Sequence, residues 1–158
     1  TLSTAGIAKM IKRLGDDGVK FNLALSLHAA NDKKRSEIME INDSNNLETL
    51  REALVYFHEK TEARITFEYI LLSGFNDSME DAAELARFAR CVPCKINVIE
   101  YNPIEDGIFQ KSNPEQTDQF VSFLTQKNLI VNVRRSRGKD IDAACGQLAN
   151  KTKLKSPI

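Results

Sequence analysis

Cys145 has the local surroundings of a reactive thiol. Small residues precede it, and Gly146 follows it and leaves the sulfur sterically accessible. Nearby positive charge lowers the pKa of a thiol and increases the fraction of nucleophilic thiolate, and such cations also bind RNA phosphates. The same spacing fits a solvated basic turn beside a buried cysteine. The basic residues close to it in the sequence are Arg134, Arg135, Arg137 and Lys139.

Three groups of polar residues fall where predicted strands end. Ser3, Thr4 and Gly6 can present a hydroxyl and backbone N–H groups to an anion at a helix start, or simply cap that helix. In the second, His28 is either a ligand contact or a structural histidine with satisfied hydrogen bonds. Asn102 precedes Pro103 and fits a turn as well as a ligand contact. The groups are Ser3, Thr4 and Gly6; Ser26, Leu27 and His28; and Asn102.

Cys91 and Cys94 have the CxxC spacing of a redox pair or of half a zinc site. No second CxxC and no suitable pair of histidines follows in the sequence. Cys94 is expected at the start of a strand, at the end opposite the other candidates. We therefore interpret both cysteines as small, buried structural residues and expect no metal ligand in this chain.

Helices and strands alternate in the predicted pattern. Apolar spacing of 3.6 residues predicts helices, and alternation predicts strands. Such alternation favours right-handed βαβ units in a mainly parallel sheet, with ligands at the carboxyl ends of the strands. We expect an α/β domain over residues 1–150, a partial barrel or an open sheet, and a flexible basic tail at 151–158. The predicted helices are 4–14, 32–39, 47–60, 78–90 and 114–127; the strands are 21–27, 64–72, 95–101 and 129–134, with one more ending just before Thr1.

The composition excludes several classes of protein. The 158 residues carry 22 basic and 22 acidic side chains, so overall charge does not attract the chain to nucleic acid or to membranes. Three widely spaced cysteines argue against a secreted disulfide scaffold, and no apolar run approaches the roughly 20 residues of a membrane span. The first residues contain neither an initiator Met nor a signal peptide. We interpret the chain as a cytoplasmic piece of a longer protein.

Several of these segments occur together in the order and spacing of one family. From residue 1 to about residue 150, the chain resembles the carboxyl-terminal part of the radical S-adenosylmethionine (SAM) RNA methyltransferases, which methylate carbon 2 of an adenine in large-subunit ribosomal RNA and in transfer RNA. The last motif is the most specific. The matching residues are 3–6, 26–29 with Asn31 and Asp32, 94–97, 102–103 and 137–148.

The resemblance implies a fold and a mechanism. The family fold is a partial six-stranded (β/α) barrel, of which this chain would supply the later strands. A [4Fe-4S] cluster held by a CxxxCxxC loop, reduced by a partner such as flavodoxin, splits one SAM. The resulting radical takes a hydrogen from a methyl group carried on a cysteine that matches Cys145, and a second cysteine releases the product. Positions matching SAM contacts are Ser3, Ser26, Leu27, His28 and Asn102; Arg134, Arg135, Arg137 and Lys139 are candidate RNA contacts.

The chain also departs from the family pattern. The CxxxCxxC loop is absent, and Lys139 stands where the motif is commonly acidic. We therefore expect the isolated chain neither to bind the cluster nor to turn over. Two alternatives remain open: the related subclass that methylates carbon 8 of the same adenine and confers antibiotic resistance, and a non-catalytic RNA-binding homologue.

Overall fold

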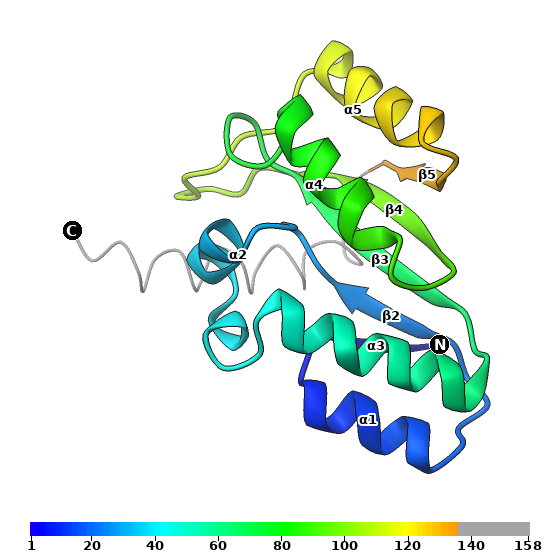
Figure 1. The fold of residues 1–158 in the computed structure, drawn as a ribbon. Coiled ribbons are helices and arrows are strands. Elements are labelled where there is room, and N and C mark those ends of the chain that lie inside the picture. Colours follow the sequence, from blue (N-terminus) through cyan, green and yellow to red (C-terminus); the bar gives the residue numbers. More distant parts are fainter. Residues whose placement is uncertain (136–158) are drawn as a thin grey trace.

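The computed structural model describes residues 1–135, which form one five-stranded sheet with helices between the strands (Figure 1). All four strand pairings are parallel, and the strands lie in the order β1-β2-β3-β4-β5. This arrangement is an α/β fold and matches a partial TIM-like barrel. The strands are β1 (Leu2–Thr4), β2 (Leu23–Ser26), β3 (Ile65–Leu71), β4 (Cys94–Glu100) and β5 (Ile130–Arg134); the helices are α1 (Ala8–Asp16), α2 (Asp32–Ile38), α3 (Leu47–Thr61), α4 (Met79–Ala89) and α5 (Pro114–Gln126), with a 3-10 turn at Glu40–Asp43.

The two faces of the sheet have different chemistry because successive side chains in a strand point to opposite sides. Leu25, Phe67 and Val98 lie on the face covered by α1, α3, α4 and α5, and belong to the main hydrophobic core (Figure 1). We call the opposite side of the sheet the inner face. It carries mainly polar residues: Ser3, Ala24, Ser26, Thr66, Glu68, Lys95, Asn97 and Asn132.

A second, smaller core closes the carboxyl end of the inner face. Ile70 and Ile99, from β3 and β4, pack there with Ile38 of α2 and with Tyr101. Figure 1 shows α2 beyond the carboxyl end of β2, where Lys34 of α2 pairs with Asp81 of α4 over 2.8 Å. The region where ligands gather in such sheets is therefore bordered by α2 and by the segment after β4.

Local capping signals set most helix starts. The Asn46 side chain accepts from the Thr49 N–H, and Ser78 forms a reciprocal capping box with Asp81. Asn113 caps α5, whose first residue is Pro114. The predicted helix starts near 47, 78 and 114 are confirmed to within a residue. None of the helices in the described part of the chain has the length and apolar character needed to span a membrane.

The amino-terminal prediction was wrong. Residues 2–4 form β1, whereas we expected a strand ending before Thr1 and a helix from residue 4, and α1 begins only at Ala8. Thr4 accepts a hydrogen bond from the Gly6 N–H over 3.0 Å but caps no helix. The Ala8 N–H is instead bound by the Asn45 side chain over 2.8 Å. Neither feature leaves a periodic pattern in the sequence. The Ala8–Asn45 contact joins residues far apart in the chain, and β1 is only three residues long.

Candidate functional site

The structure gathers several predicted site residues near one edge of the sheet. Ser3 pairs with Ala24, so Ser3 and Ser26 lie on the inner face of neighbouring strands. His28 and Asn102 follow the carboxyl ends of β2 and β4. Ser3 and Asn102 are exposed and Ser26 is half-buried. Leu27 differs, because its side chain is fully buried in the main core and only its backbone faces this edge.

His28 is held in a buried and conformationally unusual position. Its φ of 59° lies in the left-handed region, and the residue is 3% exposed. The ring atom Nδ1 accepts the Ile70 N–H over 3.0 Å, which requires an unprotonated Nδ1 and puts the proton on Nε2. Burial, with a smaller contribution from the positive charge of Arg35, lowers its pKa to about 3. The imidazole is therefore neutral near pH 7, and Nε2–H is its hydrogen-bond donor.

Asn76 fixes the backbone at His28. Its Nδ2 donates to the carbonyl oxygens of His28 and Ile70, each over 2.8 Å, and its Oδ1 accepts the Leu72 N–H over 2.7 Å. The Tyr69 hydroxyl donates to the Asn76 carbonyl over 2.8 Å. The side chain is fully buried and joins the ends of β2 and β3. Sequence reasoning missed this residue; an Asn-Asp pair in the Gly-containing turn after an apolar strand was the available signal.

Arg35 ties the carboxyl ends of β1 and β2 to α2. The side chain is fully buried. Burial lowers its pKa to about 10, a shift that the nearby Asp32 partly opposes, so the guanidinium remains charged at neutral pH. Sequence reasoning missed it as well, because an arginine on a short polar helix is normally exposed. Its four acceptors are the carbonyl oxygens of Ala5 (2.8 Å), Ser26 (2.8 Å) and Leu27 (3.0 Å), and Asn42 Oδ1 (3.1 Å).

A row of polar side chains crosses the inner face from β2 to β5. Ser26, Glu68, Asn97 and Asn132 are successive partners in the sheet register. The Asn97 Nδ2 donates to Glu68 Oε1 over 3.2 Å. The other carboxylate oxygen, Oε2, is buried and has no hydrogen-bond partner. Sequence reasoning missed Glu68, although a single acid inside an apolar strand was a usable signal.

Two of the four predicted basic residues can be placed. Arg134 is the last residue of β5 and is exposed. Arg135 lies next to it and pairs with Glu100, with 3.0 Å between Arg135 Nη1 and Glu100 Oε2; Lys111 pairs with the other carboxylate oxygen of Glu100. Part of the predicted cluster is thus neutralised locally. Arg137, Lys139, Cys145 and the tail at 151–158 lie outside the described residues.

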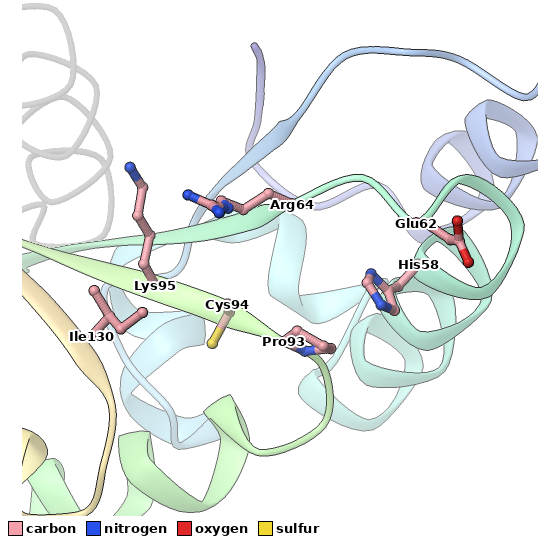
Figure 2. Close-up of a pocket in the computed structure, with 7 residues that line it drawn as sticks. All are labelled: His58, Glu62, Arg64, Pro93, Cys94, Lys95 and Ile130. Atoms are coloured by element: carbon pink, nitrogen blue, oxygen red, sulfur yellow. The ribbon is translucent and has the colours of Figure 1, made fainter.

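Cys91 and Cys94 lie at the opposite, amino-terminal end of the sheet. Burial raises the pKa of the Cys91 thiol to about 11 and that of Cys94 to about 12. Cys94 Sγ donates to the Ala89 carbonyl over 3.3 Å. Figure 2 shows its sulfur on one side of β4 and Lys95 on the other. Cys94 and Lys95 line a cavity of about 260 Å³. Its other lining residues are His58, Glu62, Arg64, Pro93 and Ile130.

The described residues do not fit an iron–sulfur cluster. Cluster ligands are cysteine thiolates, and residues 1–135 contain two cysteines, fewer than the three that a CxxxCxxC loop supplies. Within this part of the chain, no group of three or more His, Cys, Asp or Glu side chains is arranged to hold a metal ion. The inner face, in contrast, offers hydroxyls, amides and one carboxylate oxygen that lacks a donor.

No family model matches the chain. A probable dual-specificity RNA methyltransferase RlmN from Cytophaga hutchinsonii is 61% identical over 151 residues, which cover 96% of this chain and 41% of the relative. Similar proteins are the probable RlmN of Salinibacter ruber (50% identity, 95% of this chain and 41% of the relative) and the RlmN of Campylobacter lari (41% identity, 94% and 42%). The chain therefore spans about two-fifths of the length of these relatives.

Solved structures resemble the fold. A radical SAM methyltransferase from Sphaerobacter thermophilus superposes with a TM-score of 0.84 and 39% identity, over 92% of this chain and 42% of that protein. A domain of a pyruvate-formate lyase-activating enzyme from Bacteroides vulgatus gives a TM-score of 0.58 at 14% identity, over 84% of this chain and 97% of the domain. The second likeness shows a shared fold alone.

Proposed function

We propose that this chain, a homologue of the dual-specificity RNA methyltransferases named RlmN, is the carboxyl-terminal part of a radical-SAM enzyme that methylates carbon 2 of an adenine in large-subunit ribosomal RNA and in transfer RNA. The observation that carries the proposal is the 39% identity and TM-score of 0.84 to a radical SAM methyltransferase over 92% of the chain. Its RNA substrates would be met in the cytoplasm.

The inner face and its carboxyl edge suit SAM. When bound, SAM supplies an electrophilic methyl group and an adenosyl group. Ser3, Ser26 and Asn102 offer side-chain hydroxyl and amide groups to it. The Leu27 N–H already donates to the Glu68 carbonyl, and the Leu27 carbonyl already accepts from Arg35 and Ala29, so Leu27 would act by placing Ser26 and His28 on either side of it. His28 offers a neutral Nε2–H. Arg35 and Asn76 act on these residues through the backbone, by holding the carbonyl groups of Ser26, Leu27 and His28 in place.

Cys145 is the proposed methyl carrier. Its thiol loses a proton, the sulfur attacks the SAM methyl carbon, and the bond from that carbon to the SAM sulfur breaks to leave S-adenosylhomocysteine. Arg134, Arg137 and Lys139 remain candidate contacts for RNA phosphates, whereas Arg135 must first leave Glu100. In the full-length enzyme the [4Fe-4S] cluster and the site for a reductant such as flavodoxin lie outside this chain.

Two experiments test the proposal. Iron and sulfide analysis after anaerobic reconstitution should find no stoichiometric cluster in the 158-residue chain, and a four-iron cluster would contradict the placement of its ligands elsewhere. Mass spectrometry of the full-length enzyme after incubation with SAM should find one added methyl group on Cys145. The Cys145→Ala protein should lack the methyl group and the matched Cys91→Ala protein should retain it. Methylation of the protein without Cys145 would refute this role.

Analysis of the modified nucleoside separates the proposed reaction from its relatives. Carbon-2 methyladenosine in ribosomal and transfer RNA is the expected product. Carbon-8 methyladenosine would assign the enzyme to the antibiotic-resistance subclass. RNA binding without a methylated product would instead indicate a non-catalytic homologue.

A further inference from the structure

The inner face contains one polar group that the chain leaves unsatisfied. Glu68 Oε2 is buried and has no donor, whereas Oε1 of the same carboxylate is bound by Asn97. Buried carboxylate oxygens are costly without a hydrogen bond, and an unsatisfied one needs an explanation. Among the described residues, no ion pair joins Glu68 to a cation. The missing donor therefore comes from outside residues 1–135.

The neighbours of Glu68 indicate where that donor belongs. Ser26 is its register partner on β2, and adjacent strands are about 4.8 Å apart. Ser26 is also one of the proposed SAM contacts. The Glu68 residue as a whole is half-buried, and the last torsion of a glutamate is broad, so Oε2 lies within reach of a molecule bound on the inner face.

The negative charge of Glu68 limits which part of SAM can supply the hydrogen-bond donor. The methionine end carries a carboxylate beside its ammonium group, and Glu68 would repel that carboxylate. The flat faces of the adenine ring suit an apolar surface rather than this polar row. A ribose hydroxyl is neutral and suits a row made of one carboxylate, two amides and one serine hydroxyl. Carboxylates are common acceptors for ribose hydroxyls in nucleotide sites.

We propose that Glu68 binds SAM by accepting a hydrogen bond from a ribose hydroxyl through Oε2, while Asn97 holds Oε1. This inference rests on the proposed function, because it takes the inner face as the SAM site. It adds a binding residue from β3 to those at the ends of β1, β2 and β4. Asn97 acts as a positioning residue for the carboxylate.

Equilibrium binding tests the contact without any need for turnover. The probes are S-adenosylhomocysteine and its 2′-deoxy and 3′-deoxy forms, titrated against the full-length enzyme by calorimetry. Glu68→Gln keeps the size of the side chain but replaces the accepting oxygen with a donor. It should weaken binding of S-adenosylhomocysteine about tenfold, since a bond to a charged acceptor is lost. Glu115→Gln, at an exposed position on α5, is the matched control and should bind as the unaltered protein does.

The deoxy probes identify the partner atom and keep the test independent of the variant's folding. One of them should bind the unaltered protein about tenfold more weakly than the parent ligand, and that penalty should vanish in Glu68→Gln. Equal affinity of the unaltered protein for all three ligands, or undiminished binding by Glu68→Gln, would overturn the role of Glu68 alone. If the unaltered protein binds neither SAM nor S-adenosylhomocysteine, the proposed function fails together with this inference.

Discussion

Substituting Arg35 by methionine should destabilise the carboxyl ends of β1 and β2. Methionine has a similar unbranched shape but no donor. The four acceptors that Arg35 serves are three backbone carbonyls and the Asn42 side chain. Because the carbonyl oxygens belong to the backbone, they stay in place when the arginine is removed. The substitution therefore takes away the donor and leaves its acceptors without a hydrogen bond.

The magnitude follows from which acceptors keep a partner. The Leu27 carbonyl also accepts the Ala29 N–H over 2.7 Å, so it loses least. Asn42 is buried and Ser26 is half-buried, so each loses the donor that Arg35 supplies at about 1–3 kcal/mol. Ala5 is exposed, so water can replace the donor to its carbonyl at a lower cost. Removing a buried charge returns part of this, because the desolvation of the guanidinium is no longer required. We expect a net loss of about 3–5 kcal/mol in the free energy of unfolding.

Urea denaturation followed by circular dichroism measures this loss. Arg35→Lys keeps the charge but lacks the planar fork of donors, so it should fall between the unaltered protein and Arg35→Met. The control is Arg51→Met on α3, where the arginine is exposed and pairs with Glu48; it should change stability by less than about 1 kcal/mol. Hydrogen exchange adds a local readout, because amide protection should fall first around residues 26–29.

Equal destabilisation by Arg35→Met and Arg51→Met would refute this role of Arg35. A cost of less than about 1 kcal/mol for Arg35→Met would refute it as well, because the acceptors would then find other donors without penalty.

Three further outcomes are expected. The pKa of His28 is about 3 in the folded chain against 6.5 when unfolded, so below pH 6.5 protons bind preferentially to the unfolded chain. The contribution of His28 to the free energy of unfolding should therefore fall by about 1.4 kcal/mol per pH unit from pH 6.5 towards pH 3. Urea titrations at pH 7 and 5.5 should show this loss, and a His28→Gln protein with the same pH dependence would contradict it. Asn76→Ala should lower the free energy of unfolding by about 2–4 kcal/mol in the same assay, and Asn76→Asp, which keeps the acceptor but loses both donated bonds, should lower it by less. Unchanged stability in both variants would show that Asn76 does not hold the ends of β2 and β3 together. Cys91 and Cys94, with pKa values of about 11 and 12, should react with iodoacetamide at pH 8 far more slowly than in urea, as followed by mass spectrometry, and equal rates would show that burial does not protect them.

The sequence predicted the elements whose signals are local. Ser78 and Pro114 mark helix starts through side chains within one turn, and the apolar strand predicted at 64–72 is observed as Ile65–Leu71. The alternation of elements was enough to predict a parallel α/β sheet. β1 was not predicted, because three residues are too few to show the alternation of a strand. Its place is set by pairing with β2.

The site was predicted less completely because its supports act over long separations. Asn76 binds the His28 carbonyl from 48 residues away, and Arg35 reaches Ala5 from 30 residues away. Nothing in residues 32–39 alone distinguishes a buried arginine from an exposed one. The strand-end position of His28 was readable, but its left-handed backbone and its buried Nδ1 contact depend on β3.

The order of the sheet has a consequence for handling the protein. Each strand pairs with the next one in sequence, so within the described residues β1 and β5 each have a neighbour on one side alone. Ile130 and Val133 of β5 are exposed as well. Open strand edges template pairing with other chains, and a net charge of zero removes the long-range repulsion that would keep copies apart. The isolated chain should therefore self-associate edge to edge as its concentration rises, and dilute solutions at a pH away from neutrality will favour the monomer.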